Sequence, residues 1–236
     1  DIFENQFDGL NITINNGFLE SQTGDIILQA TDNITIINGL SLTFDPGGSI
    51  TFTADADGDG VGDFSMDQTQ SITTPGREIN ISGERITAGT IITNTFNGGA
   101  INLTANSDIN VRRLDSGTNG AGTGGAVTVT SVNGAINVIG AANSAVESGS
   151  AGEGLGNGGN ITLRARGNIT TSDVTARSNS DGTAGNITII SEQGSIDTTA
   201  ATFGVHAFGA TGGTINLDAF NNINVGSVRS DAFDNG

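Results

Sequence analysis

One phrase recurs along this chain of 236 residues: a glycine-rich turn, an apolar–polar–apolar triplet, and then a small residue or a polar turn. The triplets read Ile-Asn-Leu, Val-Thr-Val, Ile-Thr-Leu, Ile-Thr-Ile and Ile-Asn-Leu in the five clearest copies. Repeats of this kind predict an array of coils in which each copy buries its apolar face against its neighbours. Eight copies are recognisable, and their leading residues, 22 to 34 positions apart, are Ile26, Ile50, Ile79, Ile101, Val127, Ile161, Ile187 and Ile215.

A second apolar segment follows the first within nearly every copy. In the copy that begins at Ile50, an acidic tract interrupts the chain where this segment is expected. Apolar and polar residues alternate strictly, and no stretch carries the 3.6-residue stripe of a helix, so we expect strands with one buried face. The sequence therefore predicts an all-β fold, a parallel β-solenoid of about eight coils of 22–34 residues, forming a rod roughly 40 Å long. The second segments begin at Ile34, Ile86, Ile109, Ile136, Ile169, Ile196 and Ile223.

The repeat runs through the whole chain, so we expect a single solenoid domain over residues 1–236. Residues 1–49 are a degenerate version, 50–88 a coil with an acidic insertion, 89–229 regular coils and 230–236 a short tail. The Gly/Ser/Asn-rich tracts 116–125 and 148–159 predict loops that protrude from one corner of the rod. No capping segment is recognisable at either end, which favours continuation by flanking repeats or head-to-tail stacking of copies.

The charge and composition exclude several classes of function. The formal net charge of −17 comes from 25 acidic residues against 8 basic ones, all arginine, and such a surface repels nucleic acid. The chain has no cysteine and no lysine, which excludes thiol chemistry and Schiff-base catalysis. No apolar run approaches the roughly 20 residues that a membrane-spanning helix needs. An acidic, cysteine-free chain rich in Gly, Asn and Thr is typical of a secreted bacterial surface protein.

The repeated Gly-Gly-Asn-Ile-Thr-Leu phrases, and the tract from Thr51 to Ala88 with its Gly-Arg-Glu-Ile-Asn-Ile-Ser-Gly segment, carry a family resemblance. The chain resembles the repeat regions of cyanobacterial filamentous-haemagglutinin-like exoproteins. That resemblance implies a right-handed β-helix, exported by two-partner secretion and displayed at the cell surface as a fibre or an adhesin. The Asn-Pro-Asn-Gly motif expected in the secretion domain of such proteins does not occur in this sequence.

The sharpest local signal is the acidic tract at 55–63, which places carboxylates at loop positions one, three, five and nine and a glycine at position six. Calcium-binding loops use this spacing, because alternate residues direct oxygen ligands at one point and the glycine permits a sharp turn. Position twelve is Met66 where an EF-hand has glutamate, and Asp67 is a possible substitute. A solvated acidic turn is the alternative interpretation. The predicted calcium ligands are Asp55, Asp57, Asp59, the carbonyl of Val61, and Asp63.

Carboxylates stacked on adjacent coils would suit general acid–base chemistry on a polysaccharide. The candidates Asp108, Asp173 and Asp197 occupy different repeat positions, and no Tyr or Trp is present to stack on sugar rings. His206, the single histidine, falls in a segment that we expect to be a surface loop. We therefore predict that the chain is not an enzyme.

Between the two inward residues of each first strand lies a polar residue, and these residues predict a Thr/Asn ladder up one flat face. The ladder is Thr51, Asn80, Asn102, Thr128, Thr162, Thr188 and Asn216. Ice binding is an alternative for this face, although the mixture of Thr and Asn interrupts the regular array of methyl and hydroxyl groups that ice binding needs.

Taken together, the sequence predicts a secreted, non-enzymatic fibre protein, with an adhesin stalk that binds glycans through the corner loops as the alternative.

Overall fold

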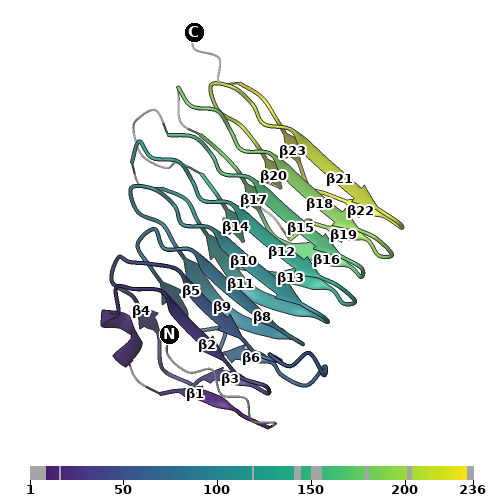
Figure 1. Cartoon of the computed structure of the whole chain (residues 1–236). Helices are drawn as coiled ribbons and strands as arrows, with labels where there is room; N and C mark the ends of the chain where they lie inside the picture. Colours follow the sequence, from purple (N-terminus) through teal and green to yellow (C-terminus); the bar gives the residue numbers. More distant parts are fainter. Residues whose placement is uncertain are drawn as a thin grey trace.

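The computed structural model describes residues 9–15, 17–118, 120–140, 145–149, 156–178, 181–200 and 204–232. Over these residues the chain is a parallel β-solenoid, with one short 3₁₀ helix and no α-helix. The coils stack along one axis, with β1 (Ile12–Ile14) at one end of the stack and β23 (Val228–Arg229) at the other (Figure 1). The predicted all-β solenoid is therefore confirmed.

The first strand of each coil belongs to one eight-stranded parallel sheet, which we call the first row. Each strand pairs in register with its equivalent one coil away, so the leading apolar residues of the repeat stack on one another. The strands of this row, in order, are β2 (Ile26–Gln29), β5 (Ile50–Thr53), β8 (Ile79–Gly83), β10 (Ile101–Ala105), β12 (Val127–Ser131), β15 (Ile161–Ala165), β18 (Ile187–Ser191) and β21 (Ile215–Ala219).

The remaining strands form a second sheet with two rows, joined through β9 and β11, each of which pairs with both rows. The second row is β1 (Ile12–Ile14), β3 (Ile34–Ile36), β6 (Phe64–Met66), β9 (Ile86–Ile92), β11 (Ile109–Asp115), β13 (Ile136–Val138), β16 (Ile169–Thr171), β19 (Ile196–Asp197) and β22 (Ile223–Asn224). The third row adds β4 (Leu42–Thr43), β7 (Ser71–Thr73), β14 (Val146–Glu147), β17 (Val174–Thr175), β20 (Val205–His206) and β23 (Val228–Arg229).

The copy that begins at Ile50 keeps its second strand, contrary to the interruption that the sequence suggested. Strand β6 begins at Phe64 and pairs with β3 and β9 on either side. The acidic tract is therefore an insertion at the corner between β5 and β6, where other coils turn in a few residues. Phe64 takes the place of the usual isoleucine, and its ring stacks on Phe52 at 5.6 Å inside the coil.

A column of glycines explains why the repeat begins with Gly. A β-carbon added to Gly125, Gly159, Gly185 or Gly213 would lie under 3.0 Å from the carbonyl oxygen of the equivalent glycine one coil earlier. Successive coils therefore approach each other here more closely than any side chain allows. The predicted role of these glycines as turn residues is incomplete, because close packing between coils requires them.

One buried arginine ties three successive coils together near the N-terminal end. Arg77 is 2% exposed, and its Nε donates a hydrogen bond to the carbonyl of Gly48. Its terminal nitrogens donate to the carbonyls of Gln22 at 2.8 Å and Gly24 at 2.6 Å. The guanidinium also lies 5.7 Å from the ring centroid of Phe44. Burial lowers the pKa of Arg77, and the charge of Asp25 acts in the opposite direction. The carbonyl contacts help to compensate the buried charge.

The two ends of the stack differ. At the N-terminal end Ile26 and Leu28, the inward residues of β2, are 2% and 7% exposed, and Ile12 and Leu19 pack against the core beside them. Leu19 belongs to the 3₁₀ helix η1 (Gly17–Ser21), which lies against β4. The apolar core is therefore covered at this end, which we call the sealed end, although β2 keeps one unpaired edge within the described residues and no cap was recognisable in the sequence.

At the C-terminal end the last described coil is open. The inward residues of β21 are partly exposed, and Ile223 and Val228 on β22 and β23 are 46% and 49% exposed. Within the described residues, β21, β22 and β23 each pair with a strand on one side only. Residues 230–232 still follow the coil, since Gly209 and Ala232 form a parallel bridge, while residues 233–236 of the predicted tail lie outside the described residues.

Candidate functional site

The acidic insertion forms a tight turn at the corner between β5 and β6. Asp55 adopts a left-handed conformation with φ of 52°, and Gly58 and Gly60 have φ of 74° and 84°. Backbone N–H groups of the same loop hold two of the carboxylates: Gly60 donates to Asp55 at 3.1 Å, and Val61 donates to Asp59 at 2.8 Å. The glycines supply the conformations that the repeated Asp-Gly sequence suggested.

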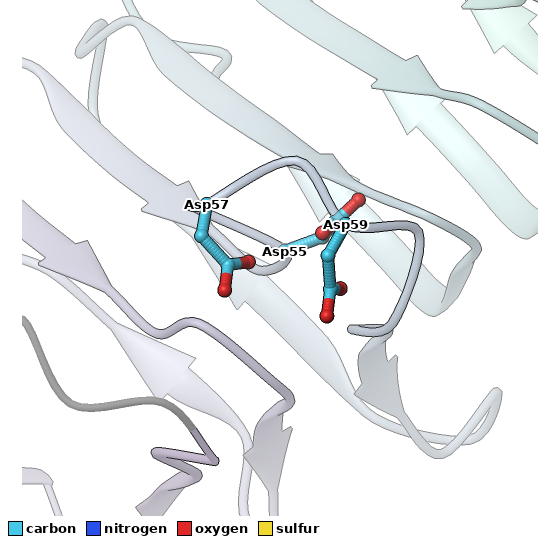
Figure 2. A group of neighbouring side chains, drawn as sticks. All are labelled: Asp55, Asp57 and Asp59. Carbon is cyan, nitrogen blue, oxygen red and sulfur yellow. The ribbon is translucent and has the colours of Figure 1, made fainter.

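Three of the predicted calcium ligands come together in this turn. Carboxylate oxygens of Asp55, Asp57 and Asp59 all lie within 4.8 Å of one another, and Figure 2 shows the three side chains around one turn of chain. Within the described residues this is the one group of at least three acidic or histidine side chains close enough to hold a metal ion. Three hard oxygen donors at one point are a donor set that fits Ca²⁺.

The remaining positions are arranged differently. Asp63 lies 3.4 Å from Arg85 and forms an ion pair with it. The carbonyl of Val61 stays a predicted ligand, since the exposure of its side chain does not bear on it. Met66 is buried in β6 and offers no ligand. Asp67, the possible substitute, accepts hydrogen bonds from the N–H and hydroxyl of Thr69, which lower its pKa and hold it in its own turn. The geometry thus brings together three of the five predicted ligands, Asp55, Asp57 and Asp59.

A second candidate site, which the sequence analysis missed, lies on the third row in the middle of the rod. It is an open pocket of about 310 Å³ between the coils that carry β11 and β14. Asp115 and Glu147 stand side by side on its floor, because Asp115 pairs in register with Glu147 of the next coil. Gly117 and Thr118 of the 116–125 loop, and Gly149 of the 148–159 loop, form part of its wall.

Two arginines hold the carboxylates of this pocket in one network. Arg113 contacts Asp115 at 3.0 Å and Glu147 at 3.2 Å through the same terminal nitrogen, Nη2. Arg177 contacts the other oxygen of Glu147 at 3.3 Å. Asp115 also accepts hydrogen bonds from the amide of Asn94 at 3.1 Å and from the backbone N–H of Gly117 at 3.0 Å. Two negative and two positive charges therefore balance within the pocket.

The pocket carboxylates are largely withdrawn from water. The side chains of Asp115 and Glu147 are 8% and 14% exposed, whereas the two arginines remain more than one third exposed. Burial raises the pKa of Asp115, and Arg113 acts in the opposite direction. Aligning Leu114-Asp115 with Val146-Glu147 would have revealed this pair, but the intervening loops differ in length and hid the alignment.

The carboxylates considered for polysaccharide chemistry are not brought into one register position. Asp197 pairs with Thr170 and Asn224, and Asp108 precedes β11 at the position of Ala135 in the next coil. Asp173 is fully buried and accepts a hydrogen bond from the N–H of Gly204 at 2.7 Å. His206 is not the surface loop residue that we expected: it lies in β20, is 9% exposed and contacts Ser227 at 3.3 Å.

The predicted polar ladder is present on the first row, where its residues pair in register from Thr51 to Asn216. The amide of Asn102 donates to the amide oxygen of Asn80 at 2.9 Å, so side chains bond along the rod axis. The ladder therefore contributes to coil stacking.

No family model, no curated protein and no solved structure matched the chain. Among the described residues, no helix has the length and apolar character needed to cross a membrane. The function must therefore be argued from the geometry.

Proposed function

We propose that this chain is a secreted, non-enzymatic structural protein whose β-solenoid units stack into a cell-surface or extracellular fibre. The resemblance to filamentous-haemagglutinin-like exoproteins supports this proposal. So does the architecture, because a solenoid of uniform coils makes a stiff rod and extends by adding coils. The acidic surface would keep neighbouring rods apart.

The observation that carries the proposal is the open C-terminal coil. An inner coil has its inward residues covered by neighbours on both sides, whereas Ile223 and Val228 are about half exposed. Unpaired strands with an apolar inner face are a template for further strand pairing. Strand β2 of a second copy, which pairs on one side only within the described residues, or a flanking repeat of a longer chain, would continue the contacts that β18 already makes with β21.

Electron microscopy of the full chain over a concentration series tests this proposal. We expect rods of about 40 Å that join end to end as the concentration rises, with particle lengths near multiples of that value. Ile223→Asp should weaken the association about tenfold or more, because it buries a carboxylate in the contact. Thr188→Asp, on the outer face of β18, is the matched control. Single rods at every concentration, or equal effects of both substitutions, would contradict the proposal.

We further propose that calcium binds the turn at 55–59 and rigidifies that corner. The support is the three-carboxylate geometry, since carboxylates this close repel one another unless a cation lies between them. Adding CaCl₂ to chelator-treated protein should raise the melting temperature, and Asp57→Asn together with Asp59→Asn should abolish the rise. Asp218→Asn, on the exposed face of β21, is the control. A rise that survives in the double variant would contradict a site at this turn.

An adhesin stalk is the second candidate, and one observation favours it. The loops predicted to carry a receptor site, 116–125 and 148–159, both contribute to the wall of the Asp115–Glu147 pocket. Residues 119 and 150–155 of these loops lie outside the described residues. Replacing Thr118 and Asn94 should reduce attachment to cells without changing rod association, which separates this candidate from the fibre proposal.

A further inference from the structure

The pocket on the third row has an entirely polar lining, and this polarity limits the kinds of ligand that can bind there. Every side chain in its lining is charged or polar, and the remaining lining residues are glycines. Pockets for drug-like ligands are lined mainly by apolar and aromatic side chains, so this one suits a hydrophilic molecule. Its volume of about 310 Å³ lies at the small end of ligand pockets, which fits one ring-sized molecule.

The charges of the pocket argue against a simple ion as the ligand. Asp115 and Glu147 are balanced by Arg113 and Arg177, so the pocket offers neither a net positive nor a net negative charge. What it does offer is unused hydrogen-bonding capacity. Glu147 accepts contacts from two arginine nitrogens, although an ionised carboxylate has about four acceptor positions. The Nε atoms of Arg113 and Arg177 have no hydrogen-bond partner among the described residues, but they are buried, so the capacity that a ligand can use lies on Glu147.

The planar groups of the pocket have a shape that matches neighbouring hydroxyl groups. A carboxylate, a guanidinium and an amide each present two polar atoms in one plane, and adjacent hydroxyls on a ring can bond to both. An exposed aromatic ring follows the lining residues in the chain without belonging to them: Phe96 is two residues beyond Asn94, and its ring lies against Gly120, two residues beyond Thr118. Thr95 and Thr118 form the parallel bridge that joins these two segments.

We propose that this pocket binds a single saccharide unit, a polyhydroxylated ring held by Glu147, Arg177 and Asn94. The carboxylate of Glu147 accepts hydrogen bonds from two hydroxyls, while the Arg177 guanidinium donates to ring or hydroxyl oxygens. Gly117 and Gly149 keep the entrance free of side chains. This inference deepens the adhesin candidate by naming its ligand class, and it does not depend on stacking of the rod ends.

Saturation-transfer NMR on the full chain tests the assignment, with D-glucose, D-galactose, D-mannose and D-glucuronate as probes. We expect a saturable signal from at least one sugar. Glu147→Gln should weaken that binding about tenfold, the effect of losing one charge-assisted contact worth about 1.4 kcal/mol. Glu192→Gln, which removes an exposed carboxylate paired with Arg164 elsewhere on the rod, is the matched control and should bind as the native chain does.

Two further variants keep the test decisive if Glu147→Gln does not fold. Asn94→Ala alters the wall and Phe96→Ala removes the exposed ring beside Gly120, both without breaking the ion pairs, and each should weaken the binding severalfold. The proposal is overturned if no sugar gives a saturable signal, or if the Asn94 and Glu192 variants bind equally well. It is also overturned if sodium sulfate alone binds the pocket and the sugars do not, because the pocket is then an anion site. Rod association, measured on the same samples, reports on the fibre proposal separately.

Discussion

The two ends of the solenoid have the same strand arrangement but opposite exposure. Leu28 and Leu217 occupy the same register position, at the first and last strands of the first row, yet Leu28 is buried and Leu217 is partly exposed. Strands β2 and β21 each pair on one side only within the described residues, so the difference lies in what covers their side chains. At the N-terminal end the 3₁₀ helix and β1 add Leu19 and Ile12 to the core, whereas no such segment follows β23 within the described residues.

This contrast shows that burial in a solenoid is supplied by the neighbouring coil. A single coil of short strands cannot enclose its own apolar residues, so an end is sealed only by a segment that departs from the repeat. The N-terminal region has such departures: the 3₁₀ helix, the large side chains of Phe44, Phe52 and Phe64, and the buried Arg77. The C-terminal coils keep the regular pattern of small and β-branched residues.

Arg77→Ala should have the largest effect, because the sealed end depends on this side chain. The substitution leaves several buried carbonyl groups without a partner and opens a cavity, and we expect a loss of about 4 kcal/mol. Thermal unfolding followed by circular dichroism measures the change. Arg85→Ala, which removes only the exposed ion pair with Asp63, should cost less than about 1 kcal/mol. Comparable losses of unfolding free energy in both variants would mean that Arg77 does not hold the sealed end together.

The glycine column offers the next test, since its members meet the preceding coil whereas Gly226, outside the column, meets nothing. Gly185→Ala forces a β-carbon against the backbone of the preceding coil, and we expect a cost of about 3 kcal/mol. Gly226 has no atom within 4 Å of the place where a β-carbon would stand, so Gly226→Ala should be nearly neutral. Melting temperatures of the two variants give the comparison, and equal values would contradict the close approach of the coils.

The equivalent leucines test the comparison directly. Leu28→Ala and the mid-rod Leu163→Ala should each cost about 3 kcal/mol, because both remove a buried side chain, while Leu217→Ala should cost about 1 kcal/mol. The measurement is urea unfolding of the three variants. If the chain associates through its open end, the cost of Leu217→Ala should rise with protein concentration. Equal costs at low concentration would show that the C-terminal coil is covered after all.

The smallest expected effect is on the stability of the protein at acidic pH. The backbone and hydroxyl of Ser49, one coil away, donate to Asp25 and lower the pKa of its carboxyl. A carboxyl whose pKa is lowered by folding contributes stability above its unfolded pKa of about 3.9, and this stability is lost as the pH falls through the lowered value. Asp25→Asn should therefore flatten the decline in melting temperature between about pH 4 and pH 2, whereas Asp218→Asn should not. If the melting temperature of Asp25→Asn falls with decreasing pH as steeply as that of the native chain, the inter-coil role of Asp25 is contradicted.

Most of the fold was predictable because its signal is repeated. Nearly every coil places isoleucine or valine at the same two positions, Phe64 being the exception, so the strands, their parallel pairing and the inward column follow from the spacing. The sealing segments were not predictable, because they break the repeat. Nothing in the sequence around Arg77 indicates that its side chain reaches carbonyls 28 to 55 residues away.

The candidate sites show the same division. The Asp55–Asp59 turn was predictable because its spacing is local, but the separation of Asp63 required the position of Arg85 one coil away. The Asp115–Glu147 pair was missed because the partners are 32 positions apart and the irregular loop 116–125 lies between them in sequence. His206 was misplaced because two-residue strands such as β20 carry too little alternation to be recognised.

Every strand pairs with a strand of the adjacent coil, and this pairing also determines the order in which the rod folds. Each contact spans one repeat, so the entropy of closing the loop is nearly the same for every coil and does not grow with the length of the rod. The sealed end contains the aromatic residues and the buried Arg77, and it is synthesised before the C-terminal coils, so it can serve as the nucleus. Later coils then add one at a time onto a completed edge, and the kinetic barrier to folding is met once.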